Sequence, residues 1–244
     1  AQFNLPDEAG GYIFRGARKK ILYIGKATVL KDRVRSYFSK DLVESRSPAI
    51  VKMIEEAITL DWQQTDSVLE ALILEANLIK QNMPPYNVQS KDNKSFNYLV
   101  ITKEPYPRLQ VVRGRELFQN WNDSQIKKLF GPFPQGQSLQ EAVKIVRKIF
   151  PFRDAKCTPC GTGKNKACKP CFNRQIGMCP GPCTGEITEA EYAQTIKHIS
   201  ELFSGNFQGL KRQLTKEMKD AAKSQDYEKA SDKDLQETQK KIIF

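Results

Sequence analysis

A single carboxylate, Glu75, lies in the most apolar helix that this chain can form. Ser67 and Glu70 have the spacing of a capping box at the start of the nearly apolar run 67–79. The helical period places one apolar face around Glu75, with Val68, Leu72 and Ile79 on it. A buried carboxylate needs a cation or hydrogen-bond donors. Glu75 is therefore predicted to hold a metal ion at a cleft, or else to pair with a buried Arg or reach the helix edge.

The length of 244 residues predicts two or three domains, since most domains have about 100–150 residues. The sequence has no run of about 18 apolar residues and no signal-peptide pattern at its start. We expect a soluble cytoplasmic protein with no membrane segment. Because the chain starts Ala1-Gln2 without an initiator Met, we also expect a fragment of a longer protein.

The charge of the chain is concentrated in its middle third. Of the formal net charge of +11, residues 1–100 contribute +2, residues 101–186 contribute +9, and residues 187–244 contribute 0. Clustered positive charge is what a surface that contacts phosphate groups requires. Nucleic acid is the partner that this distribution predicts.

The chain has one histidine, His198, within a polar helical stretch. Its single copy excludes nucleases that bind zinc through a His pair and disfavours a Ser-His-Asp triad. Acid or base chemistry is then left to Tyr, Lys, Glu or Asp. His198 itself is expected to be a solvated helix residue.

Sequence periodicity predicts an α/β (α+β) chain whose first domain covers residues 1–95. This domain is expected to contain a β-hairpin, two helices, a third strand and the Glu75 helix, which ends near Met83 because Pro84-Pro85 cannot continue it. The hairpin strands are expected at 12–14 and 20–24, the two helices at 28–38 and 47–57, and the third strand at 58–63.

Three further regions are predicted. Residues 96–150 are expected to form a basic α/β region with strands at 97–102 and 108–113, a rigid loop from Phe130, and a helix to Ile149 capped by Ser138 and Glu141. Residues 151–186 are expected to form a cysteine-rich metal-binding segment. Residues 187–244 are expected to be helical, with a helix at 189–203 and a helical hairpin at 210–241. The thin apolar stripe of this hairpin either docks a partner or folds onto its own chain; it comprises Leu214, Met218, Ala221 and Ala222.

The first domain gathers groups that suit phosphodiester hydrolysis. The predicted hairpin carries two phenols that can face one side, the next helix carries a cation and a phenol four residues apart, and a Pro-rich turn adds an amide. These residues are Tyr12 and Tyr23 with Lys26, Arg33 with Tyr37, and Asn87. With Mg²⁺ or Mn²⁺ on Glu75 to polarise phosphoryl oxygens, the cations would offset developing charge and a phenol would handle the proton of water.

The same residues, in this order, resemble the GIY-YIG nuclease domain of the UvrC excinuclease family. The similarity rests on Gly10-Gly11-Tyr12, Tyr23-Ile24-Gly25-Lys26-Ala27, Arg33, Tyr37, the run Leu74 to Ile79, and Pro85-Tyr86-Asn87. The resemblance implies a small mixed sheet flanked by helices, Glu75 as the single metal ligand, and Tyr12 and Tyr23 as candidate general bases. Lys26, Arg33, Tyr37 and Asn87 complete the implied site. Gly11 departs from the family, which prefers Ile or Val there.

Six cysteines in a predicted cytoplasmic chain indicate a metal site, because disulfides are reduced in that compartment. Their two C-x2-C pairs fit a structural zinc, while ligation by thiolates alone equally fits an iron-sulfur cluster. The segment from Cys171 to Cys183 is similar to UvrC sequences, and this resemblance implies a 4Fe-4S cluster on Cys157, Cys171, Cys179 and Cys183, with Zn²⁺ as the alternative. Cys160 and Cys168 are additional to that pattern and would complete a zinc knuckle.

The tail around Leu214, Met218 and Tyr227 resembles the UVR motif, through which UvrC binds the helicase subunit UvrB. The resemblance covers nearly the whole chain and corresponds to the N-terminal half of UvrC. It implies a metal-dependent endonuclease that makes the 3′ incision in damaged double-stranded DNA during nucleotide excision repair, as part of the UvrABC system. The alternatives are a non-catalytic DNA-binding adaptor that recruits UvrB, and a standalone GIY-YIG nuclease.

Overall fold

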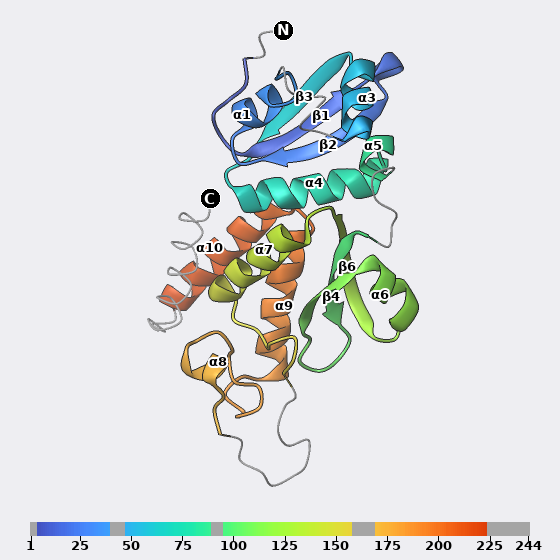
Figure 1. Ribbon diagram of the computed structural model, residues 1–244. Coiled ribbons are helices and arrows are strands. Elements are labelled where there is room, and N and C mark those ends of the chain that lie inside the picture. The colour runs from blue at the N-terminus through green and yellow to red at the C-terminus, as the bar shows by residue number, and fades with distance from the viewer. Residues whose placement is uncertain (1–3, 40–46, 89–94, 158–168, 224–244) are drawn as a thin grey trace.

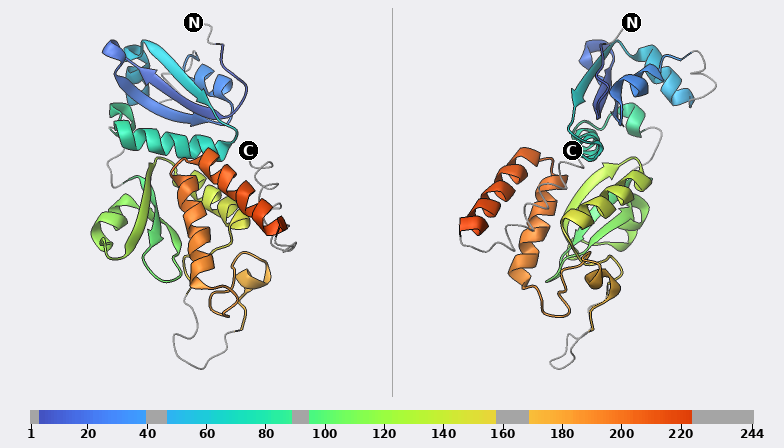
Figure 2. Two further views of the ribbon diagram at one scale, coloured as in Figure 1. Left: turned by 180° about the vertical axis from the view of Figure 1, so that it is seen from behind. Right: turned by 90° about the vertical axis from the view of Figure 1, so that its left-hand side faces the viewer.

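A computed structural model of the chain describes residues 4–39, 47–88, 95–157 and 169–223 (Figure 1). One three-stranded sheet lies in the N-terminal part, a second lies in the middle part, and helix α4 (Val68–Asn82) runs between them. Figure 2 shows α4 nearly end-on, in the layer that separates the two halves. The α+β class predicted from the sequence is confirmed.

The first sheet has the strand order β2-β1-β3. Its strands are β1 (Gly10–Arg15), β2 (Ile21–Ala27) and β3 (Thr59–Gln64), and a 3-10 turn (Ala17–Lys19) joins the first two. The predicted hairpin is therefore confirmed. Both pairings are antiparallel, so the expected mixed sheet is corrected for the described strands.

Helices cover both faces of the first sheet. On one face, Tyr12 and Phe14 pack with Leu30, Val34 and Met53 in a common core, and the last three belong to α1 (Leu30–Arg35) and α3 (Pro48–Glu56). Helix α4 contacts β1 and β2, and the short helix α5 (Pro85–Val88) contacts β2. The sheet thus lies between helices, and this packing fixes the side chains of β1 and β2.

Helix α4 begins where the capping residues predict. The Ser67 side chain accepts a hydrogen bond from the Glu70 amide at 3.1 Å, and the helix ends at Met83, whose φ of 43° is left-handed. One of its faces joins a core that also contains side chains of the second sheet and of the C-terminal helices. The α4 residues in that core are Leu69, Leu72, Ile73 and Ala76. The helix therefore belongs to two layers of the molecule.

The second sheet has the order β5-β4-β6, again antiparallel. Strands β4 (Asn97–Thr102) and β5 (Leu109–Arg113) confirm the predicted pair. Strand β6 (Ile126–Phe133) was predicted as a loop from Phe130 onward, and α6 (Gly114–Asn120) was not predicted. The loop prediction was wrong because an edge strand tolerates Pro132, whereas an interior strand would not.

Helix α7 (Gly136–Ile149) begins two residues before Ser138, with Gln135 at its N-cap. The predicted Ser138–Glu141 capping box is therefore wrong. Ser138 lies inside the first turn and donates its hydroxyl proton to the Gln135 side chain at 3.0 Å. Glu141 instead accepts a hydrogen bond from Gln137, one turn earlier, at 3.1 Å.

The described C-terminal helices are α9 (Glu189–Phe203) and α10 (Phe207–Lys223). Helix α9 matches the predicted range and starts with a capping box between Thr188 and Glu191. The expectation of a solvated His198 is wrong: it is 5% exposed, and its Nε2 lies 3.2 Å from Oε1 of Glu217 on α10. The remainder of the predicted hairpin lies outside the described residues.

The cysteine-rich segment contains little regular structure where it is described. Its one described helix, α8 (Phe172–Gln175), starts directly after Cys171. Cys160 and Cys168 fall outside the described residues, so their predicted role is not addressed by the structure. Among the described residues, no helix is both long and apolar enough to cross a membrane.

Candidate active site and cysteine centre

The β1–β2 register places Tyr12 directly over a glycine. Tyr12 pairs with Gly25 across the two strands. A Cβ atom on Gly25 would lie 2.3 Å from both Cζ and Oη of Tyr12, which is far inside contact distance. Only glycine leaves room for the tyrosine ring to lie flat on β2. Gly25 was quoted in the sequence motif but given no role, and its position opposite an aromatic residue was the signal.

Three phenols gather on this face of the sheet. The ring centroids of Tyr12, Tyr23 and Tyr37 lie 5.9–6.4 Å apart. The hydroxyl oxygens of Tyr12 and Tyr37 are 2.8 Å apart in a buried hydrogen bond. Tyr12 and Tyr23 do face the same side, as the hairpin predicted. We call Tyr12, Tyr23, Arg33, Tyr37, Glu75 and Asn87 the phenol site.

Arg33 joins this cluster from helix α1. Its Nε donates a hydrogen bond to the Tyr12 hydroxyl at 3.2 Å, and its guanidinium carbon lies 5.4 Å from the centroid of the Tyr37 ring. The predicted helix over 28–38 is shorter in the structure, because α1 ends at Arg35 and Tyr37 lies in the turn after it. The expected common helical face is therefore wrong, although the two side chains do meet. A cation is thus held at the edge of the phenols, where it would meet an incoming anion.

Glu75 faces the first sheet from α4 and is 5% exposed. Its Oε1 accepts a hydrogen bond from the backbone amide of Lys26 at 3.1 Å. Lys26 pairs with Gly11, and this pair is adjacent to the Tyr12–Gly25 pair along the two strands. Alternation along a strand therefore places the Lys26 side chain on the opposite face from the phenols. The contact that Lys26 makes with the site is through its main chain.

Asn87 connects α5 to the middle of β2. Its Oδ1 accepts a hydrogen bond from the amide of Ile24, and its Nδ2 donates to the carbonyl of the same residue, both at 2.8 Å. Through these two bonds the Asn87 side chain pairs with β2 as the backbone of a neighbouring strand would. Asn87 therefore fixes the backbone between Tyr23 and Gly25, and its contacts are those of a positioning residue.

Burial and neighbouring groups keep the phenols protonated. Burial raises the pKa of Tyr12 well above its usual value; Tyr23 and Tyr37 raise it further, while Arg33 acts in the opposite direction. The pKa of Tyr23 is also raised, by burial first, then by Tyr37 and by the carboxylate of Glu75. The electrostatic effect of Glu75 on Tyr23 shows that these two groups are neighbours. Neither phenol is ionised near neutral pH without a further cation.

The departure at Gly11 is compensated by α4. A Cβ atom on Gly11 would lie 3.0 Å from Cδ2 of Leu74. The leucine side chain thus occupies the space that a branched residue on the strand would otherwise fill. Glu75 follows Leu74 in sequence, so this contact helps to seat α4 against the sheet.

Four predicted cysteine ligands lie within the described residues. Cys179 is buried, Cys157 and Cys183 are partly exposed, and Cys171 is exposed. Burial raises the pKa of Cys179, and Cys171, Cys157 and Cys183 raise it further, against the effect of the Gly181 amide. The other three thiols thus act on Cys179 electrostatically, although among the described residues no group of three or more His, Cys, Asp or Glu side chains is placed to hold a metal ion. We call these four residues the cysteine centre.

The apolar stripe predicted in the tail is divided by the structure. Leu214, with 3% of its area exposed, and Leu210, with 2%, are buried in the core that contains one face of α4. Met218 is partly buried, and the side chains of Ala221 and Ala222 lie outside the described set. The first part of the predicted docking stripe thus folds onto its own chain.

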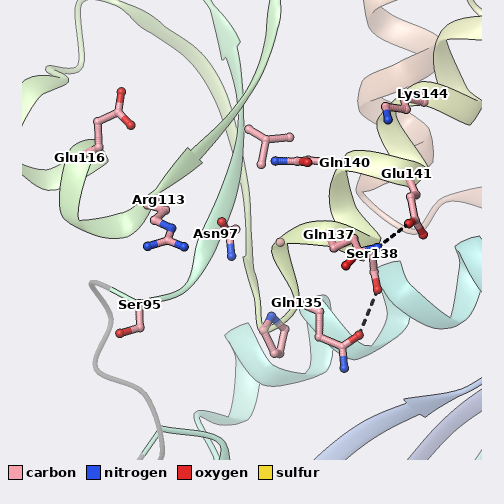
Figure 3. Close-up of a pocket in the computed structure, with 13 residues that line it drawn as sticks. Ser95, Asn97, Arg113, Glu116, Gln135, Gln137, Ser138, Gln140, Glu141 and Lys144 are labelled. Carbon is pink, nitrogen blue, oxygen red and sulfur yellow. Dashed lines mark hydrogen bonds between the residues drawn. The ribbon is translucent and has the colours of Figure 1, made fainter.

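A polar hollow of ≈ 980 Å³ lies elsewhere, between the second sheet and the start of α7 (Figure 3). The charged residues in its lining are two basic and two acidic, namely Arg113, Lys144, Glu116 and Glu141. It contains none of the residues of the phenol site or the cysteine centre. Its formal charges balance, so it does not attract phosphate more strongly than the surrounding basic surface.

Comparison with known families assigns all three parts of the chain. The UvrC-like GIY-YIG domain matches residues 8–88, which contain the phenol site, so the site belongs to a GIY-YIG domain. The middle domain of UvrC/Cho excinuclease matches residues 96–202, and the UvrB/uvrC motif matches residues 208–232. The chain belongs to the UvrC family, as its sequence motifs predicted.

Individual relatives agree with this assignment. UvrABC system protein C of Haloarcula marismortui is 38% identical over 232 residues, which is 93% of this chain and 37% of the relative. The protein of the same name from Carboxydothermus hydrogenoformans is 40% identical over 228 residues, which is 93% of this chain and 35% of the relative. The chain thus spans little more than a third of these relatives.

One solved structure is similar over the first domain. It is the GIY-YIG N-terminal endonuclease domain of UvrC from Thermotoga maritima, bound to its catalytic divalent cation, magnesium. The sequences are 40% identical, and the match covers 35% of this chain and 89% of that chain with a TM-score of 0.31.

Proposed function

We propose that this chain is a metal-dependent DNA endonuclease that makes the 3′ incision in nucleotide excision repair, as part of a UvrABC system. The observation that carries the proposal is the buried carboxylate of Glu75, held by the Lys26 amide beside Tyr23 and close to the Tyr12–Tyr37–Arg33 cluster. A carboxylate, phenols and a guanidinium in one place are the groups that phosphodiester hydrolysis needs. The cytoplasm is the proposed location.

Glu75 is the residue that would hold the divalent ion. A single carboxylate oxygen donor fits Mg²⁺ or Mn²⁺, because Mg²⁺ commonly takes one or two protein carboxylates and completes its shell with water and substrate phosphate. Such an ion, when bound, would polarise the phosphoryl oxygens of the scissile phosphate. The remaining roles belong to the side chains around it.

Arg33 and Tyr23 are proposed to divide those roles. Arg33 would offset the negative charge that develops on the phosphate as water attacks in line. Tyr23 would handle the proton of that water, because it is the phenol on which the Glu75 carboxylate acts electrostatically. Tyr23 is protonated in the resting site, so it would act as the base only after a divalent ion bound at Glu75 had lowered its pKa and its own proton had passed to solvent.

Damaged double-stranded DNA is the proposed substrate, and the basic residues 101–186 are its proposed contact surface. The net charge of +9 in this stretch would bind phosphate groups without reading bases. UvrB is the proposed protein partner. Because Leu210 and Leu214 are buried in this chain's own core, its docking surface would lie further along the motif, from Met218 to residue 232.

The cysteine centre is proposed to hold a 4Fe-4S cluster, with Zn²⁺ as the alternative. The support for this proposal is the donor set, namely four cysteine thiols in one segment, of which Cys179 is affected electrostatically by the other three. Ligation by thiolates alone suits both a zinc ion and a four-iron cluster. The Gly181 amide, which favours the Cys179 thiolate, would serve either metal.

A cleavage assay tests the enzymatic proposal. With Mg²⁺ or Mn²⁺, a lesion-bearing or nicked duplex, and UvrB present, Glu75→Gln is expected to cut at least about 10³-fold more slowly than the unaltered chain. Glu70→Gln is the matched control, because it changes a carboxyl group on the same helix and keeps an oxygen for the Asp66 amide. Cleavage no faster than background by both chains would favour the non-catalytic adaptor, and equal rates above background would exclude Glu75 as the metal ligand.

A binding assay separates the UvrB-dependent nuclease from a standalone one. The chain and a Met218→Ala, Tyr227→Ala variant are compared for capture by UvrB. Loss of capture by the variant is expected. Undiminished capture would mean that this segment is not the docking surface, and cleavage that is independent of UvrB would support the standalone nuclease.

A further inference from the structure

Two arginines, one buried and one largely buried, hold the backbone of the cysteine-rich segment at two places. Arg153 is 3% exposed. Its Nη2 donates to the carbonyl of Cys157 at 3.0 Å, and its Nη1 donates to the carbonyl of Tyr106 at 2.6 Å and to Glu104 at 3.2 Å. Arg153 therefore ties the first residue of the cysteine centre to the loop between β4 and β5.

Arg147 makes the corresponding contact at the third cysteine. Its side chain is 13% exposed and reaches from the last turn of α7. Its Nε donates to the carbonyls of Phe152 and Met178, each at 3.0 Å, and its Nη1 donates to Asp154 at 2.8 Å. Met178 directly precedes Cys179. The two arginines thus fix the backbone where two different ligand positions begin.

Each arginine also retains a buried donor. Within the described parts of the chain, Nε of Arg153 and Nη2 of Arg147 are buried and have no hydrogen-bond partner. A buried charged donor without an acceptor is unfavourable, and native structures rarely keep one without a reason. Both guanidinium groups hydrogen-bond beside a ligand position, Arg153 at the carbonyl of Cys157 and Arg147 at the carbonyl that precedes Cys179. Each spare donor therefore lies where the cysteine-rich segment begins to present its thiols.

We propose that Arg147 and Arg153 form a cationic seat for the metal centre: they fix the main chain at Cys157 and Cys179, and their spare N–H groups donate to sulfur atoms of the bound group. Thiolates bound to metal are hydrogen-bond acceptors and carry negative charge. Glu104 lies between Arg153 and Arg108 and binds both, so this trio has one surplus positive charge. The inference rests on the metal centre of the proposed function.

The two arginines are positioning residues, and their effect is measured on the metal rather than on cleavage. Arg153→Lys and Arg147→Lys keep the charge but lose the planar fork of donors. The variants and the unaltered chain are purified anaerobically, and iron and zinc per chain, the rate of metal loss to a chelator, and the reduction potential of any cluster are measured. Arg15→Lys is the matched control, because Arg15 also binds a carboxylate, Asp61, and a main-chain carbonyl, that of Lys19, but lies on β1 in the first sheet.

Several-fold faster metal loss is expected for both seat variants, with a potential more negative than that of the unaltered chain, because hydrogen bonds to sulfur raise the potential of a cluster. Arg15→Lys is expected to match the unaltered chain. Circular dichroism of each variant checks that it is folded, and a purely structural role would lower thermal stability without moving the potential. If the centre holds zinc, the rate of zinc loss to the chelator is the quantity compared between the variants.

Unchanged loss rates and potentials in both folded variants would overturn the seat and leave the metal centre standing. An unaltered chain that holds neither iron nor zinc would overturn the metal centre, and the seat with it. The two failures are therefore distinguished by the metal content of the unaltered chain alone.

Discussion

The phenol site and the cysteine centre are built in different ways. In the phenol site, strand register, one glycine and the Asn87 amide place Tyr12 and Tyr23 before any ligand arrives. In the cysteine centre, little regular structure surrounds the thiols, and the described backbone depends on contacts from arginines. The first site is preorganised by its fold, whereas the second, as proposed, would be completed only by a bound metal.

Loss of one cysteine should give the largest effect and should leave the other site intact. Cys179→Ser is expected to lose nearly all metal bound at the cysteine centre, since Cys179 is its buried member. Glu75→Gln is expected to keep that metal in full. Metal analysis of the two purified variants makes the measurement. Full metal content in Cys179→Ser would show that these thiols are not its ligands.

A methyl group on Gly25 should damage the preorganised site next most. Gly25→Ala drives a Cβ into the Tyr12 ring, so we expect a loss of about 1–3 kcal/mol in the free energy of unfolding. Cleavage should fall about 10²-fold, because the phenol is displaced from its place. Urea denaturation and the cleavage assay measure the two effects.

Gly11→Ala is the control for that experiment. It adds the same methyl group to the same strand pair but meets only the flexible tip of Leu74. Its effect on unfolding should stay below about 1 kcal/mol. Equal damage from both substitutions would argue against a special role for the Tyr12–Gly25 contact.

Alkaline pH should change the free energy of unfolding through the phenol site, and this effect should be smaller than those of the substitutions above. The phenol of an unfolded chain ionises near pH 10, whereas the folded chain keeps Tyr12 protonated because its pKa is raised. The stability due to this phenol is therefore present below about pH 10 and is lost as the pH rises above it, by about 1.4 kcal/mol per pH unit. Unfolding by urea between about pH 8 and pH 11 should be less pH-dependent in Tyr12→Phe. Identical curves would contradict the raised pKa.

Acid pH should act weakly on the support of the cysteine centre. Burial would raise the pKa of Glu104, but hydrogen bonds from Thr102 and Arg108 and the charge of Arg153 lower it overall. Its contribution is present above the unfolded pKa of about 4.3 and is lost as the pH falls through the lower, folded value. Glu104→Gln should remove this dependence, at a cost below about 1 kcal/mol near neutral pH. Thermal melts between about pH 3 and pH 7 test it.

The sequence predicted those features that depend on local pattern. Ser67 and Glu70 marked the start of α4 correctly, and the phenol hairpin followed from β-rich runs around a basic turn. The common side of Tyr12 and Tyr23 follows from strand alternation, which is short-range, whereas Tyr37 joins them from the turn after α1 and not from the predicted helical face. These are the elements in which local propensity and tertiary packing agree.

The errors came from contacts made over long distances in sequence. His198 looked solvated because α9 is polar, but Glu217 and Phe150 enclose it from two other helical segments. Arg147 and Arg153 received no role, because their acceptors lie as far away as Met178 and Tyr106. Asn87 was assigned to the site, but its role in holding the Ile24 backbone was not predicted, because nothing in the local sequence indicates that contact.

Among the elements that the structure describes, helix α4 contributes to both halves of the molecule. Toward β2 it presents Glu75, and on its other side Ile73 and Ala76 share a core with Leu210 and Leu214 of α10. A cut between residues 88 and 96 would therefore uncover this side of α4. The shorter piece would expose leucine and isoleucine side chains to water, so we expect it to be less soluble than the whole chain.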